Sequence, residues 1–208
     1  MESMKVRVTF QEDLLGTSPN DAEIFEKYIH SKAPDASTLQ EEVEALGAEE
    51  VVRNGMTVFP RTDKGEPFIY DYQVKGFFKD ACGMLSRIGG KAETGKKKTI
   101  NESCKLTAYK KIIDGLIFVK PRKIVVNLSG AISKCQRPLR ASTPQGERVS
   151  LACSESIPSG SFIEFEILCL DSAHWPAVTE WLHYGALRGM LQWRNSGKGA
   201  FIWEEISD

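Results

Sequence analysis

The stretch that most constrains the fold lies near the end of the chain, where four glycines interrupt an amphipathic segment. Gly185 and Gly189 fall inside the helical pattern, where each glycine costs about 1 kcal/mol relative to alanine. Two such glycines four residues apart indicate that another backbone comes close to this helix. Gly197 and Gly199 follow in a short basic loop, and an apolar strand is expected over residues 200–206.

Apolar residues elsewhere recur with two different periods along the chain. Alternation predicts strands, and apolar residues three and four apart predict amphipathic helices. Strands are expected over residues 5–10, 56–60, 67–72, 116–119, 123–128, 148–153 and 161–170. Helices are expected over 21–31, 37–46, 73–87 and 102–114, and over a last helix that starts near Pro176. These segments predict one α+β domain over residues 1–208 with an antiparallel sheet.

Two of these helices have a clear apolar stripe. In the helix over 73–87 the stripe is Val74, Phe77, Phe78, Ala81, Cys82 and Leu85. In the last helix it is Val178, Trp181, Leu182, Gly185 and Ala186. We expect both stripes to face the core, with Asp71 capping the first of these helices.

Other segments interrupt the pattern as insertions. An acidic helical insertion is expected over about 20–50 and a basic insertion over about 89–115. Residues 62–65 predict the turn of a hairpin. Residues 134–148 contain arginines but little hydrophobic periodicity, so we expect an extended segment that lies across a sheet.

Charge is strongly polarised, although the net charge of the 208 residues is only −1. Residues 1–71 have a net charge of −8, from 7 Lys and Arg against 15 Asp and Glu, and residues 149–208 have −5, from 3 against 8. Residues 75–148 have +12 instead, from 17 against 5. Such asymmetry indicates an anionic partner, or copies of the chain that meet plus to minus.

Single-stranded nucleic acid fits this pattern, because cations follow its backbone while aromatic rings stack on its bases. The aromatic residues near the basic segments are Tyr70, Tyr72, Tyr109, Tyr184, Trp193 and Trp203. Of these, Trp193 is expected to be exposed beside the glycine-rich loop. The candidate contact residues are Lys75, Lys79, Lys96, Lys97, Lys98, Lys105, Lys110, Arg137, Arg140, Arg148, Trp193, Arg194, Gly197, Lys198 and Gly199.

Other chemistries find little support in the sequence. The three histidines, His30, His174 and His183, have no metal-ligand spacing with Cys, Asp or Glu, so no metal or cofactor is expected. P-loop, Rossmann and GxSxG motifs are lacking. The five cysteines are an odd number without CxxC spacing, and neither a signal peptide nor a long apolar run occurs. These features predict a reduced, cytoplasmic protein without a membrane partner.

Four stretches also occur together in a familiar order. They are an opening strand with a small-residue turn (6–16), a step into a helix that contains Lys75 and Gly76 (68–79), a turn and strand (155–167), and the glycine-rich loop with the final strand (185–201). In this order they resemble the RAMP superfamily (repeat-associated mysterious proteins), in particular the subunits that coat guide RNA in CRISPR effector complexes. Residues 70–73 depart from the serines of the family pattern.

The resemblance implies a ferredoxin-like (RRM-like) core with helices on one face of the sheet. It also implies RNA binding and head-to-tail assembly of copies. The histidine of the family's processing nucleases and the aspartate that cuts target RNA have no matching position, so cleavage is not implied. The short chain suggests a free-standing relative, for instance one encoded by a phage or another mobile element.

The leading interpretation is a non-catalytic protein that binds single-stranded RNA, or DNA, and self-associates along the strand. The alternative is an interaction module that mimics or caps a CRISPR backbone subunit and inhibits the nucleoprotein complex, as an anti-CRISPR protein in antiviral defence would. A third is a metal-independent endoribonuclease that uses a histidine with Tyr or Lys as an acid–base pair.

Overall fold

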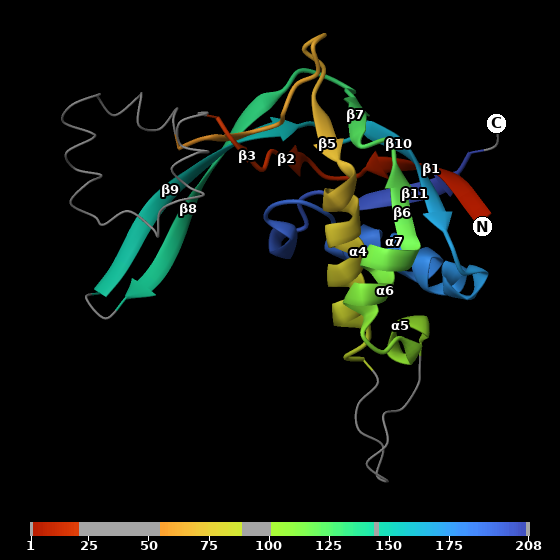
Figure 1. The fold of residues 1–208 in the computed structure, drawn as a ribbon. Coiled ribbons are helices and arrows are strands. Elements are labelled where there is room, and N and C mark those ends of the chain that lie inside the picture. Colours follow the sequence, from red (N-terminus) through yellow and green to blue (C-terminus); the bar gives the residue numbers. More distant parts are fainter. Residues whose placement is uncertain (1, 21–54, 89–100, 144–145, 207–208) are drawn as a thin grey trace.

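The computed structural model describes residues 2–20, 55–88, 101–143 and 146–206 (Figure 1). The side chains of residues 138–151 also lie outside the described part. The two expected acidic helices, over 21–31 and 37–46, and the lysine-rich segment over 91–99 therefore fall outside the described residues.

The main sheet follows a strand–helix–strand–strand–helix–strand path. Its elements are β1 (Glu2–Phe10), α4 (Asp71–Leu85), β6 (Ile117–Lys120), β7 (Lys123–Asn127), β10 (Phe162–Cys169), α7 (Trp175–Arg188) and β11 (Phe201–Glu205). The sheet order is β11-β1-β10-β7, with β6 also beside β10, and all these pairs are antiparallel. If β6 and β7 are counted together as the second strand, and β1, β10 and β11 as the first, third and fourth, this is the ferredoxin-like order 4-1-3-2. The expected α+β, ferredoxin-like class is confirmed.

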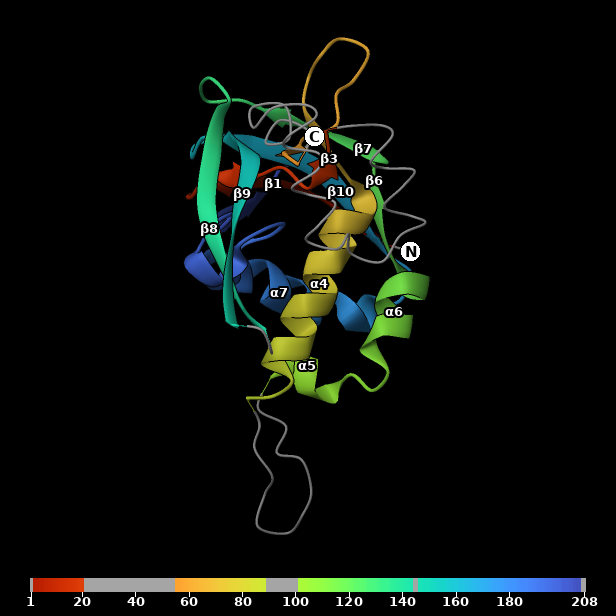
Figure 2. The same ribbon diagram turned by 90° about the vertical axis from the view of Figure 1, so that its left-hand side faces the viewer.

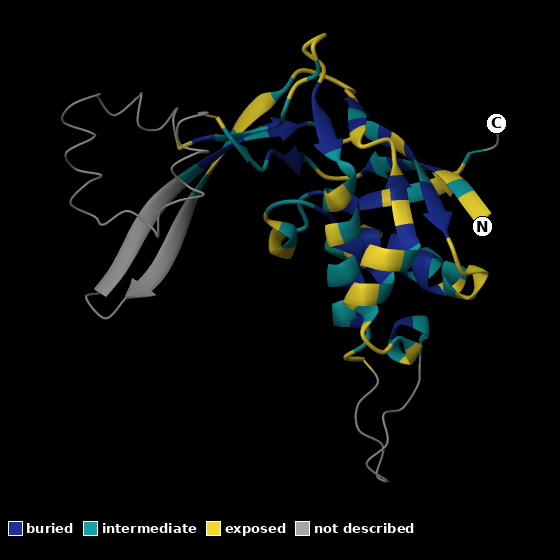
Figure 3. Ribbon diagram, in the orientation of Figure 1, coloured by how far each residue is buried: buried dark blue, intermediate teal, exposed yellow. Residues whose placement is uncertain are grey.

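Helices cover one face of this sheet, and the core lies between the two layers (Figures 1 and 3). All six stripe residues of α4 are buried, as predicted. In α7 the prediction is wrong at one position, because Ala186 is exposed and Ala177 is buried instead. Each residue advances roughly 100° around a helix, which places Ala186 beyond the edge of the stripe.

Two local predictions about helices need correction. Helix α4 begins at Asp71 after the cap residue Tyr70, so Asp71 is not the cap. Instead the side chain of Gln73 accepts a hydrogen bond from the Tyr70 backbone N–H at 2.8 Å. The helix expected over 102–114 is two helices, α5 (Glu102–Lys105) and α6 (Tyr109–Leu116), separated where Ala108 adopts a left-handed conformation.

The expected hairpin around residues 62–65 forms only at its tip, where Arg61 bridges Pro67. Its strands then separate into different sheets. Strand β5 (Phe68–Tyr70) pairs with β7 at the edge of the main sheet. Strand β4 (Thr57–Val58) joins a second sheet with β2 (Leu14–Leu15), β3 (Ser18–Pro19) and β9 (Gly146–Ile157).

A long antiparallel hairpin extends from the second sheet. It consists of β8 (Ser133–Thr143) and β9 (Gly146–Ile157), and replaces the single extended segment expected over 134–148. The hairpin is inserted between β7 and β10, and it projects as an arm beside the helical layer (Figures 1 and 2).

The C-terminal glycines act differently from the prediction of one continuous helix. Helix α7 ends at Arg188, and Gly189 has a φ of +71°. A Cβ at Gly185 would lie 2.1 Å from the ring of Phe201, so a side chain rather than a backbone comes close there. At Gly189 the close neighbour is backbone, with the Lys198 carbonyl oxygen 2.5 Å from an added Cβ. The segment 189–199, here called the glycine loop, then turns back into β11.

Candidate nucleic-acid interface

On the open face of the main sheet, Arg7 forms two ion pairs. Arg7 contacts Glu164 at 2.6 Å and Glu204 at 3.4 Å, and its guanidinium lies 4.9 Å from the centre of the Phe162 ring. RRM-type sheets instead present exposed aromatic rings on which bases stack. Around Arg7 this face presents a paired cation over a partly buried ring and not an open stacking surface.

The glycine loop meets the base of the β8–β9 hairpin at a group of three side chains. The guanidinium of Arg137, on β8, lies 4.9 Å from the centre of the Trp193 ring. Its Nη2 donates a hydrogen bond to Gln192 Oε1 at 2.8 Å. Trp193 is 40% exposed, so the prediction that it is exposed is confirmed. We call Arg137, Gln192 and Trp193 the Trp193 corner.

Gln192 fixes this corner to the body of the protein. Its Nε2 donates to the Gly16 carbonyl oxygen at 2.9 Å and lies 3.3 Å from Thr57 Oγ1. Leu191 and Trp193 both have positive φ, at +63° and +55°. Bulky residues rarely adopt this conformation, which costs on the order of 1–3 kcal/mol and is found most often at functional sites.

Arg137 has unused hydrogen-bonding capacity. Within the described part of the chain, its buried Nε and Nη1 atoms have no hydrogen-bond partner. A buried donor without a partner costs about 1–3 kcal/mol. The guanidinium fork matches the oxygens of a phosphate, and its plane stacks on aromatic rings. The corner therefore combines an exposed aromatic ring with a cation two of whose donors lack an acceptor in the described part of the chain.

The other predicted cations of the glycine loop are paired with carboxylates. Arg194 lies 3.0 Å from Asp80, which also contacts Arg188 at 2.9 Å. Lys198 donates to Asp13 at 2.9 Å, and this hydrogen bond raises the pKa of Lys198. Two arginines thus share one carboxylate, whereas Lys198 also lies 3.8 Å from a second carboxylate, Glu12, so the charges of these pairs balance.

Gly197 and Gly199 have a conformational role in the loop. Both have positive φ, at +84° and +72°. A Cβ at Gly199 would lie 2.3 Å from the Met190 carbonyl oxygen, whereas Gly197 has open space around it. The predicted bend into the last strand is therefore present, and contact of these glycines with an anion stays a prediction.

Helix α6 lies across α4 from the hairpin (Figure 2), and two of the predicted lysines, Lys75 and Lys79 of α4, contact it at Asp114. Lys79 pairs with Asp114 at 2.6 Å, and Lys75 donates to the Asp114 carbonyl oxygen at 3.1 Å. Burial lowers the pKa of Lys75, which also lies over the Phe118 ring. Lys110 is exposed on α6. These lysines form a surface separate from the Trp193 corner.

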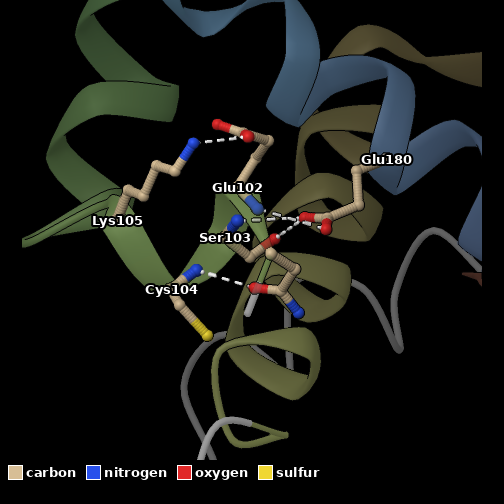
Figure 4. Close-up of polar contacts among 6 residues, drawn as sticks. Glu102, Ser103, Cys104, Lys105 and Glu180 are labelled. Atoms are coloured by element: carbon tan, nitrogen blue, oxygen red, sulfur yellow. Dashed lines mark hydrogen bonds and ion pairs between the residues drawn. The ribbon is translucent and has the colours of Figure 1, made fainter. Parts of the chain in front are cut away.

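The segment that contains Lys96, Lys97 and Lys98 is anchored on both sides. After it, Glu180 of α7 accepts hydrogen bonds from the Ser103 backbone N–H at 3.0 Å and its hydroxyl at 2.5 Å, and from the Glu102 N–H at 3.3 Å (Figure 4). Asn101 donates to the Leu85 carbonyl oxygen at the end of α4. Lys105 pairs with Glu102.

These hydrogen bonds join residues 101–103 to the end of α4 and to α7. The lysines themselves, and the side chains of Arg140 and Arg148, lie outside the described part. Their contact with phosphate stays a prediction.

A second aromatic cluster was missed as a site. The rings of Tyr70 and Tyr72 stack with centres 5.2 Å apart and planes 17° apart. The guanidinium of Arg122 lies 5.7 Å from the Tyr72 ring centre and 6.0 Å from that of Tyr70. We call these three residues the tyrosine platform. Both tyrosines stand out in the sequence as candidate stacking residues. Arg122, which directly precedes β7, comes close to them only because β5 pairs with β7.

Groups that could support other chemistry are not assembled in the described part of the chain. It contains no cluster of three His, Cys, Asp or Glu side chains suited to a metal. His183 Nδ1 lies 2.9 Å from its own helix carbonyl at Thr179, and His174 lies 3.9 Å from Asp171. None of the described helices has both the length and the hydropathy needed to cross a membrane.

Comparisons with known proteins give a match in structure but not in sequence. No protein-family model matches the chain, and no curated protein matches its sequence. A chain of a Type IV-B CRISPR complex matches with a TM-score of 0.51 and 9% identity, over 99% of this chain and 91% of its own length. At this identity, the match shows a shared fold.

A second match is a chain in the cryo-EM structure of the Type III-B Cmr-beta complex bound to cognate target RNA. Its TM-score is 0.49 with 10% identity, over 99% of this chain. The present chain spans 60% of the length of that one.

Proposed function

We propose that this protein binds single-stranded nucleic acid, RNA in preference to DNA, without cleaving it. The observation that carries the proposal is the Trp193 corner, where an exposed indole lies over an arginine with unused donors. Stacking on an aromatic ring and pairing of phosphate with a cation are the two contacts by which single strands bind. The net charge of +12 over residues 75–148 supports the proposal, as does the fold shared with a CRISPR complex chain.

The test is binding of labelled single-stranded RNA and DNA, followed by fluorescence anisotropy at low and physiological salt. We expect Trp193→Ala to weaken binding by about 1–3 kcal/mol, the contribution of one stacked base. Lys64→Ala removes an exposed cation at the tip of the 62–65 turn and serves as the matched control. If the wild-type protein binds neither strand at low salt, the proposal is wrong.

A second candidate function is assembly into, or onto, a CRISPR nucleoprotein complex. It is favoured by the extent of the structural match, which spans 91% of the Type IV-B chain. Such a protein would either replace a backbone subunit or cap a row of them, and copies would associate head to tail. Co-purification with effector subunits after nuclease treatment would support this role. Recovery of the protein alone, together with intact oligonucleotide binding, would favour the first candidate.

A further inference from the structure

The tyrosine platform presents an open aromatic surface at the start of α4. Tyr72 is the second residue of this helix and is 53% exposed. Its inner face stacks on Tyr70, with the two planes 17° apart. Offset stacking of this kind extends readily to a further ring, because every nucleobase has a π face.

The platform is held in place by its neighbours. The Asp71 backbone N–H donates to the Arg122 carbonyl oxygen at 3.1 Å, and the Asp71 carboxylate lies 3.1 Å from Arg122 Nη1. Tyr70 opposes Lys123 in the β5–β7 pair, and its N–H is capped by Gln73. The rings and the cation are therefore arranged before any ligand arrives, which lowers the entropic cost of binding.

Hydrogen bonds connect this platform to the Trp193 corner. Gln73 Nε2 donates to Thr17 Oγ1 at 2.7 Å. Gln192 Nε2 donates to the carbonyl oxygen of the adjacent Gly16 at 2.9 Å. Two consecutive residues thus tie the first turn of α4 to the loop that contains Trp193. These hydrogen bonds fix the position of one aromatic surface relative to the other.

We propose that Tyr72 stacks a second nucleobase of the bound single strand, while Arg122 contacts the neighbouring phosphate. This inference rests on the proposed function and adds to it a second point of attachment. Stacking contacts are tolerant of sequence, so the platform would secure a strand without selecting its bases. Arg122 is 70% exposed in its side chain and can reach a phosphate without leaving Tyr72.

The first experiment compares Tyr72→Ala with Tyr72→Phe, using a labelled uridine homopolymer and fluorescence anisotropy. We expect the alanine variant to bind about tenfold more weakly, within the range of a single stacked base, and the phenylalanine variant to bind like the wild type. Thermal unfolding controls for structure, because the exposed Tyr72 side chain contributes little to the core.

The second experiment identifies the contacted residue directly. Light-induced crosslinking of an iodouridine oligonucleotide, followed by mass spectrometry, should place crosslinks at Tyr72 as well as at Trp193. If the wild type binds but Tyr72→Ala binds equally well and no crosslink forms at Tyr72, the second site is wrong and the proposed function stands. If the wild type does not bind, the proposed function fails and this inference fails with it.

Discussion

At the scale of single residues, two kinds of position shape the molecule. Gly185 is required because α7 lies directly against Phe201, where an added Cβ would be 2.1 Å from the ring. Arg137 and Trp193 are instead in an arrangement that is costly for the isolated protein, with unpaired donors and a left-handed backbone. The first kind of position serves the fold, and the second points to a ligand.

Substitution of Gly185 tests how closely helix α7 packs against the Phe201 ring. We expect Gly185→Ala to lower the free energy of unfolding by about 1–3 kcal/mol, because the new methyl group overpacks the core against Phe201. Gly76→Ala is the matched control, since Gly76 is an exposed helical glycine with open space around it. That change should raise stability by up to about 1 kcal/mol. Urea unfolding measures both, and equal effects of the two changes would contradict the argument.

Substitution of Arg137 by lysine distinguishes the contribution of the planar guanidinium to binding from that of the positive charge. We expect Arg137→Lys to weaken single-strand binding by about tenfold or less, because lysine keeps the charge but loses the planar stacking group and the hydrogen-bonding fork. The dependence of binding on salt should stay unchanged, since the charge is retained. Anisotropy titrations at several salt concentrations measure both quantities. Wild-type affinity in the lysine variant would show that charge alone acts at this position.

At the scale of elements, the predictions succeeded where a segment buries one face. Helix α4 and strand β10 were predicted well because their periodicity records contact with the core. The β8–β9 hairpin was not predicted as a hairpin, because an arm that projects beyond the core does not bury one face against it. Residues 134–148 therefore lack the hydrophobic periodicity that predicts a strand. The division between α5 and α6 was missed because it falls at Ala108, which adopts a left-handed conformation without a glycine or proline to mark it in the sequence.

The candidate site was predicted only in part, for a related reason. Arg137 and Trp193 were identified as separate residues from their type and neighbours. Their connection through Gln192 depends on partners 176 and 135 positions away, at Gly16 and Thr57. Contacts of that range follow from the finished fold, and no local pattern contains them.

The α5 anchor gives a prediction about an element. Glu180 accepts three hydrogen bonds at the start of α5, and Ser103 is fully buried beneath it. We expect Glu180→Ala to destabilise the protein by about 1–3 kcal/mol, because it leaves buried donors without an acceptor. Hydrogen exchange should speed up at residues 101–105. Glu205→Ala, at an exposed position of β11, is the control, and similar exchange in both variants would refute this role.

At the scale of the whole molecule, charge is separated along the chain. The middle segment has a net charge of +12, and the segments before and after it have −8 and −5. In the described part, many cations are already paired with carboxylates, as at Asp80 and Asp114. The lysine cluster at 96–98 places three like charges together in sequence, and its contact with phosphate stays a prediction.

Salt dependence tests this view. Binding of a single strand loses affinity with a slope of about −0.7 for each phosphate neutralised, on a plot of log K against log salt. We expect replacement of Lys96, Lys97 and Lys98 by alanine to make the slope shallower by about 2, if all three contact phosphate. Lys64→Ala, at an exposed turn outside the proposed interface, measures the effect of losing one charge elsewhere on the surface. An unchanged slope in the triple variant would remove these lysines from the interface.

The Gly16–Thr17 pair has a consequence for how this protein can change. Each aromatic surface has one hydrogen-bonded link to this pair, through Gln192 to the Gly16 carbonyl oxygen and through Gln73 to the Thr17 hydroxyl. A Cβ at Gly16 would lie 2.6 Å from the backbone of Val58, so the dipeptide cannot be altered there without moving both surfaces at once. Substitution of Tyr72, Arg122 or Trp193 would therefore change one contact at a time. A substitution at Gly16 would instead change the spacing between the two aromatic surfaces.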